Sequence, residues 1–152
     1  MDSSGSALVA TKGFGRILVA VDGSEVSMRA AGRAAHIAKE EGADVIVLHV
    51  VPTPPFEVPI DVAEYHDAGR KQARKWMKEI EDTMTKEGVK AKTEIVVGAY
   101  SIVDAIVGYA ETCGVGLIVT GTRGRTPSNR FRLGSVASGL AESAGCPVLV
   151  VR

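Results

Sequence analysis

Residues 16–22 read RILVAVD, an unbroken apolar and β-branched run that ends at a glycine. Such a run is typical of a strand that is buried on both faces of a parallel sheet. Four later runs have the same character, and a segment with helical spacing precedes each of them. They are ADVIVLHVV at residues 43–51, TEIVVG at 93–98, GLIVTG at 116–121 and CPVLVV at 146–151. We therefore expect five strands that alternate with four helices.

The segments between the strands carry signals for the start and end of helices. Ser24 can cap a first helix, which Gly42 would end. Residues 61–87 form a longer amphipathic helix, and residues 101–104 form a capping box at the start of a third. A fourth helix is expected to begin at residues 134–135. The predicted apolar stripe of the second helix comprises Val62, Tyr65, Ala73, Trp76, Met77, Ile80 and Met84.

This strict alternation favours an α/β fold, because parallel neighbours need crossover connections. We expect an open five-stranded parallel sheet with helices on both faces. Residues 1–15 are rich in Ser, Gly and Ala and show no periodicity, so a flexible N-terminal lead-in is expected there. Residues 16–152 would then form one Rossmann-like domain.

The composition narrows the range of possible functions. The 152 residues include 18 basic and 18 acidic side chains, so no overall charge attracts nucleic acid or a membrane surface. We find no apolar run long enough to span a bilayer and no signal peptide. Cys113 and Cys146 lack CxxC or His-rich company, which favours two buried thiols and a reducing, cytoplasmic location.

Two loops are candidates for a binding site, because ligands of such sheets bind beyond the carboxyl ends of the strands. The first follows the first strand and supplies Asp22. The second, residues 121–135, reads GTRGRTPSNRFRLGS. Its glycines let the backbone approach a ligand, its arginines match phosphate oxygens, and its end places amides at a helix N-terminus. The pattern predicts an anion site; the alternative is an exposed polar loop with glycines at its turns.

The spacing G-x2-G-x9-G-S, formed by Gly121, Gly124, Gly134 and Ser135, resembles the nucleotide-binding signature of the ATP-binding branch of the universal stress protein family. Five blocks of the sequence agree with that family in order and spacing. They are ILVAVDGSEVS at residues 17–27, VIVLHVV at 45–51, VVG at 96–98, LIVTGTRGR at 117–125 and CPVLVVR at 146–152. The resemblance covers nearly the whole chain after residue 15. It implies the sheet order 3-2-1-4-5 of an adenine nucleotide alpha hydrolase-like fold.

The resemblance also implies which residues hold an adenine nucleotide: ATP, or else ADP or AMP. Val21 and Asp22 would lie against the adenosine, and Val45 would form a wall for the adenine. Thr120 and Gly121 would contact ribose. The residues expected around the phosphates are Arg123, Gly124, Gly134, Ser135 and Val136, and a Mg²⁺ or Mn²⁺ ion could bridge phosphate oxygens. By their position alone, Asp22 could instead be a helix N-terminal acid and Val45 a core residue.

No catalytic signature accompanies this loop. No Walker lysine follows the glycines, and the sequence has neither a G-x-S-x-G motif nor a pair of catalytic carboxylates. His36, His49 and His66 lack the spacing of metal ligands. We therefore expect at most a slow ATPase and leave open whether the protein is an enzyme.

The leading hypothesis is a nucleotide-binding regulatory or stress-response protein. The family resemblance implies a homodimer formed through the last strand, from Pro147 to Val151. One alternative is a slow metal-dependent ATPase in which Asp22 or Ser128 orients water. Another is a protein-interaction module without nucleotide, which would use the proline-rich segment at residues 52–59.

Overall fold

Five parallel strands form one sheet in the order β3-β2-β1-β4-β5 in the computed structural model. The structure describes residues 7–54, 59–123 and 133–152. Its elements are β1 (Arg16–Ala20), α1 (Glu25–Glu41), β2 (Asp44–Pro52), α2 (Val62–Lys86), β3 (Ala91–Ala99), α3 (Ile102–Thr112), β4 (Leu117–Gly121), α4 (Ser135–Ser143) and β5 (Val148–Val151). The predicted alternation and the predicted strand order are both confirmed.

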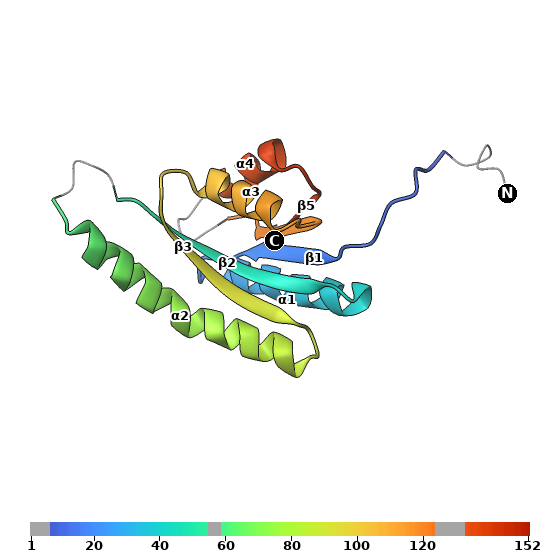
Figure 1. The fold of residues 1–152 in the computed structure, drawn as a ribbon, viewed down its shortest axis with the longest axis horizontal. Coiled ribbons are helices and arrows are strands. Elements are labelled where there is room, and N and C mark those ends of the chain that lie inside the picture. The colour runs from blue at the N-terminus through green and yellow to red at the C-terminus, as the bar shows by residue number, and fades with distance from the viewer. Residues whose placement is uncertain (1–6, 55–58, 124–132) are drawn as a thin grey trace.

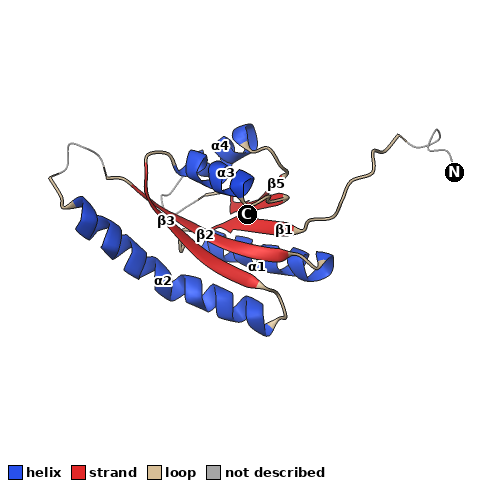
Figure 2. Ribbon diagram, in the orientation of Figure 1, coloured by secondary structure: helices blue, strands red, loops and turns tan. Residues whose placement is uncertain are grey.

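The sheet is the middle layer of three. Helices α1 and α2 cover one face, and α3 and α4 cover the other (Figures 1 and 2). Side chains of β1 alternate between the two layers, because successive residues of a strand point to opposite faces. Val19 packs toward α1 and α2, whereas Leu18 packs toward α3 and α4, and both are fully buried. Both faces of β1 therefore belong to the core, as its unbroken apolar run predicts.

The central position of β1 determines where a ligand can enter. Val19 is aligned with Val47 of β2 and with Val119 of β4. Because all three strands are parallel, their carboxyl ends meet at one edge of the sheet. The strand order reverses between β1 and β4, so the segments that follow these two strands separate and leave a crevice.

Helix α1 begins and ends where the sequence predicts. The Ser24 hydroxyl accepts a hydrogen bond from the Ser27 amide at 3.2 Å, and Gly42 ends the helix with a φ of 67°. Alanines make up most of the buried face, namely Ala30, Ala31, Ala34, Ala35 and Ala38. These small side chains let the helix lie close to the sheet, which holds Ser24 beside the end of β1.

Two expectations about burial are wrong. Val62 and Tyr65, predicted on the buried stripe of α2, are 46% and 39% exposed. The first turns of α2 extend past the end of the sheet, so only later members of the stripe reach the core (Figure 1). Cys113 and Cys146 are free, partly exposed thiols, because each lies beside the end of an element rather than within it.

Candidate functional site

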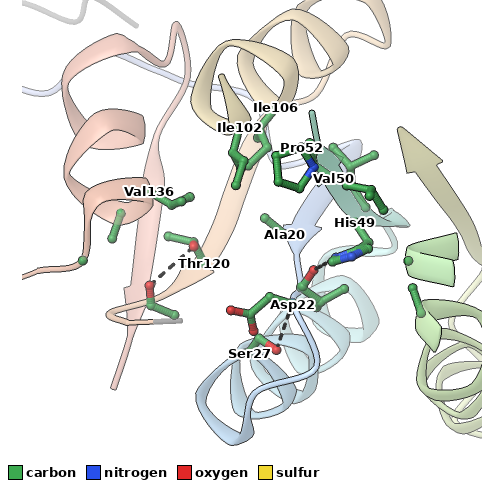
Figure 3. Close-up of a pocket in the computed structure, with 18 of the residues that line it drawn as sticks. Ala20, Asp22, Ser27, His49, Val50, Pro52, Ile102, Ile106, Thr120 and Val136 are labelled. Atoms are coloured by element: carbon green, nitrogen blue, oxygen red, sulfur yellow. Dashed lines mark hydrogen bonds between the residues drawn. The ribbon is translucent and has the colours of Figure 1, made fainter. Parts of the chain in front are cut away.

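A cavity of about 840 Å³ opens at the carboxyl edge of the sheet (Figure 3). Its walls come from the ends of β1, β2 and β4, from the segments that follow β1 and β4, and from all four helices of the described residues. The volume lies within the range of small-molecule binding sites. This crevice coincides with the reversal of strand order, where the sequence predicts a binding site.

The turn after β1 orients Asp22 at the crevice. Its Oδ1 atom accepts a hydrogen bond from the Ser24 amide at 2.9 Å, and its own amide donates to the Ser27 hydroxyl at 3.3 Å. The Val21 amide donates to the Leu48 carbonyl oxygen at 2.9 Å, which ties the end of β1 to β2. The carboxylate of Asp22 thus lines the crevice in a defined orientation (Figure 3). It can accept hydrogen bonds from hydroxyl or amine groups of a ligand.

His49 of β2 lies beside this turn. Its Nδ1 atom is 2.7 Å from the carbonyl oxygen of Val21, and since a carbonyl only accepts, Nδ1 carries the proton. The ring of Trp76 on α2 packs edge to face on the imidazole, with centroids 5.0 Å apart. Trp76 Nε1 is buried and has no hydrogen-bond partner among the described residues. Neither ring is predicted as a site residue from the sequence. A single histidine inside an otherwise apolar strand is the signal that could have indicated His49.

The end of β4 brings Thr120 and Gly121 to the same crevice. Thr120 is buried in a strand whose other residues are apolar or glycine. A Cβ atom at Gly121 would lie 2.6 Å from Val26 Cγ1 and 3.2 Å from the carbonyl oxygen of Arg123. Only glycine fits there without displacing its neighbours, so the close contact between β4 and α1 requires it.

The first turn of α4 lines another wall of the crevice through Gly134, Ser135 and Val136. The Gly134 amide donates to the Thr122 carbonyl oxygen at 2.6 Å, which connects this helix to the end of β4. No side chain caps α4, whereas a side chain caps each of the other three described helices. Uncapped amides at a helix N-terminus carry partial positive charge and attract anions.

Comparison with known proteins decides the family. Residues 13–152 match the model of the universal stress protein family. The chain belongs to the universal stress protein family. A universal stress protein of Methanocaldococcus jannaschii is 36% identical over 142 residues, which cover 91% of this chain and 82% of that protein. The universal stress protein YxiE of Bacillus subtilis is 33% identical over 149 residues, which cover 91% of this chain and 99% of that protein.

Solved universal stress proteins share the fold. UspA from Lactobacillus plantarum matches with a TM-score of 0.84 at 29% identity, over 94% of this chain and 100% of that one. A universal stress protein solved in complex with cAMP matches with a TM-score of 0.72 at 30% identity, over 93% of this chain and 99% of that one. The universal stress protein from Archaeoglobus fulgidus in complex with dAMP matches with a TM-score of 0.70 at 27% identity, over 90% of this chain and 97% of that one.

In this universal stress protein, most of the predicted site residues line one crevice. They are Val21, Asp22, Thr120, Gly121, Arg123, Gly134, Ser135 and Val136. The expectation that Val45 forms a wall for the adenine is wrong. Val45 is 1% exposed and pairs with Ile17 near the amino end of β2, away from the crevice. Val50, near the carboxyl end of the same strand, lines the crevice instead. Gly124 lies outside the described residues.

Helix α3 adds an apolar wall that was not assigned to the site. Ile102 and Ile106 line the crevice (Figure 3), although their helical spacing marks them only as core residues. Within the described ranges, no three His, Cys, Asp or Glu side chains are grouped so that they could hold a metal ion. No helix in the part of the chain that the structure describes is long and apolar enough to cross a membrane.

Proposed function

We propose that this universal stress protein binds an adenine nucleotide, ATP, in the crevice and acts as a regulatory or stress-response protein. The observation that carries the proposal is the presence of Asp22 and the uncapped first turn of α4 in one cavity. The carboxylate can accept hydrogen bonds from a ribose, and the helix N-terminus attracts phosphate. The cAMP and dAMP complexes of related universal stress proteins support an adenine ligand.

The order of the strands indicates how the nucleotide would lie. Its phosphates would lie beside β4 and the first turn of α4, where Arg123 and Ser135 line the crevice. Its ribose would face Asp22 at the end of β1. The base would then lie over the end of β2, against the apolar surface of Val50 and Ile102.

The glycine loop and a divalent ion belong to the same proposal. Gly121 and Gly134 are the described glycines of the G-x2-G-x9-G-S pattern, and Arg125, Arg130, Arg132 and Ser128 lie outside the described residues. A Mg²⁺ or Mn²⁺ ion bound mainly by phosphate oxygens needs few protein ligands. Asp22 and Ser135 are described oxygen donors at the crevice that suit such an ion.

We also propose that two copies of the chain pair through β5. This strand forms the open edge of the sheet next to β4, and its four residues are apolar and half-buried. An open apolar edge favours pairing with another strand. Nucleotide occupancy would then bias the conformation or the partners of the dimer. A cytoplasmic location and a domain boundary after residue 15 stay predictions.

Calorimetric titration of the nucleotide-stripped protein with ATP and Mg²⁺ tests the proposal. Ser135→Glu places a negative charge at the N-terminus of α4, where it favours the helix but repels phosphate. We expect the affinity for ATP to fall about tenfold or more without a loss of thermal stability. Ala141→Glu adds the same charge at an exposed position of the same helix and should leave the affinity unchanged. Failure of the unsubstituted protein to bind ATP saturably would refute the proposal.

Hydrolysis assays separate this function from its nearest alternative. A slow metal-dependent ATPase would turn over ATP repeatedly and lose turnover in Asp22→Ala while binding persists. We expect ATP to stay bound with at most slow turnover, since the described crevice has no pair of catalytic carboxylates around a water site. The interaction-module alternative depends on residues 52–59, of which 55–58 lie outside the described residues.

A further inference from the structure

Part of the crevice is lined by residues other than those predicted to hold the nucleotide. Past the end of β2 the crevice reaches from the side of the sheet that holds Val50 and Ile102 to the opposite side, where it continues along helix α2. We call this part the α2 lobe and define it by His49, Ala68, Gly69, Gln72 and Trp76. None of the residues predicted to hold the nucleotide belongs to it.

Small residues on α2 form the wall of the lobe. A Cβ atom at Gly69 would lie 2.9 Å from Val51 Cγ1, so the helix backbone lies directly over β2 at this point. Ala68 comes next to this contact, is exposed, and lines the cavity. A large side chain at position 68 would therefore occupy the lobe without disturbing the contact at Gly69.

Two aromatic rings form another wall of the lobe. The imidazole of His49 is held by its bond to the Val21 carbonyl oxygen at 2.7 Å, and the Trp76 ring packs on it at an interplanar angle of 83°. Their contact with each other and with β1 sets the orientation of both rings before a ligand arrives. Aromatic walls that are already in place favour flat aromatic groups, because little side-chain freedom is lost on binding.

The position of the lobe identifies the group that would enter it. With the phosphates beside β4, the ribose at β1 and the base over the end of β2, the edge of the adenine farthest from the ribose would point toward α2, which packs on β2 through Trp76 and His49. That edge carries the exocyclic amino group. We infer that the α2 lobe accepts a flat aromatic substituent on this edge, so the site takes base-enlarged adenine nucleotides as well as ATP. This inference rests on the proposed function.

The test compares ATP with N⁶-benzyl-ATP, each titrated into the nucleotide-stripped protein with Mg²⁺. Burial of the phenyl ring should make N⁶-benzyl-ATP bind about tenfold more tightly than ATP. Ala68→Phe fills the lobe and should remove this advantage while the affinity for ATP stays within about twofold. Ala63→Phe is the matched control, since Ala63 is exposed on the same helix but does not line the crevice.

Two further measurements support the comparison. Gln72→Phe fills the lobe from another exposed position and replaces Ala68→Phe if that variant does not fold. Trp76 is the single tryptophan of the chain, so its fluorescence should change more with N⁶-benzyl-ATP than with ATP.

Each outcome decides a separate question. Exclusion of N⁶-benzyl-ATP by a protein that binds ATP would overturn the inference and leave the proposed function standing. An equal loss of both ligands in Ala68→Phe would also overturn the inference, because the ring would then not lie in the α2 lobe. Failure of ATP itself to bind would overturn the proposed function and, with it, the inference.

Discussion

The imidazole of His49 donates a hydrogen bond from Nδ1 to the carbonyl oxygen of Val21 at 2.7 Å. This bond joins a side chain of β2 to the backbone just after β1, at the residue before Asp22. Val21 is 5% exposed, so its carbonyl oxygen has little access to water. The position of Asp22 in the crevice therefore depends on a side chain from the neighbouring strand as well as on its own turn.

His49→Ala should lower both stability and nucleotide affinity. The substitution leaves the Val21 carbonyl oxygen without this donor in a buried place, so we expect the free energy of unfolding to fall by about 2 kcal/mol. Urea denaturation measures this change, and ATP titration measures the loss of affinity. His36→Ala, at an exposed position of α1, should cost less than about 0.5 kcal/mol. An equal loss of the free energy of unfolding in the two variants would show that the hydrogen bond from His49 to Val21 does not stabilise the fold.

Gly121→Ala should destabilise the fold, because the new methyl group would lie 2.6 Å from Val26 Cγ1. Overpacking of this kind costs about 1–3 kcal/mol. Gly32→Ala is the matched control, since a Cβ atom at Gly32 meets nothing within 4 Å and the residue lies inside α1. It should raise the free energy of unfolding by up to about 1 kcal/mol. Thermal denaturation of the two variants should therefore shift in opposite directions, and a shared direction would contradict the packing argument.

Tyr109 should make stability depend on pH in the alkaline range. Its hydroxyl donates to Glu94 Oε2 at 3.3 Å, and burial together with the charges of Glu94 and Cys113 raises its pKa from 10.0 to about 12. The folded state keeps the phenol proton after the unfolded state has lost it. The stabilisation that protonated Tyr109 gives to the folded state is therefore complete below pH 10 and is lost as the pH rises through 12.

The free energy of unfolding, measured in urea across this pH range, should fall less steeply in Tyr109→Phe than in the unsubstituted protein. Phenylalanine keeps most of the ring packing and has no proton to lose. Identical slopes in the two proteins would show that Tyr109 does not carry the dependence.

Val150→Pro should separate the proposed dimer without breaking the sheet. The Pro147 carbonyl oxygen accepts a hydrogen bond from the Ile118 amide at 3.0 Å, and the Val151 carbonyl oxygen accepts one from the Thr122 amide at 2.8 Å. The backbone N–H and C=O groups of the odd-numbered residues of β5 therefore point toward β4. The N–H of Val150 therefore points to the open edge, and proline removes it there. Sedimentation should show a monomer for Val150→Pro and a dimer for Val150→Thr. A dimer that survives the proline would exclude pairing through β5.

The sequence predicts the elements of the fold better than it predicts the neighbours of each strand. The run at residues 16–22 indicates a strand buried on both faces, and Val19 and Leu18 confirm it by packing on opposite layers. Hydrophobic periodicity reports which face of a segment is buried. It does not report which strand lies beside it, because that depends on contacts between distant segments. The order 3-2-1-4-5 is therefore implied by the family resemblance and not by periodicity.

Some residues of the candidate site can be predicted from the sequence, whereas others depend on contacts between distant segments. Asp22, Gly121 and Gly134 are predictable, because a residue just after a strand, the last residue of a strand and the start of a helix are all recognisable positions at this edge of the sheet. His49 and Trp76 were missed, because they meet only when α2 packs across β2. Val45 was misplaced because a strand valine looks the same at either end, and only the register shows which end faces the crevice.

The central place of β1 makes completion of the crevice a late event in the synthesis of the chain. Residues 16–99 contain β1, β2 and β3, which neighbour one another in the sheet. Asp22 gains its opposite wall only after β4 and α4 have left the ribosome and docked. The proposed nucleotide, which spans both walls, would bind only the finished molecule and stabilise it by mass action. The cellular supply of that nucleotide would then influence how much newly made protein survives to act.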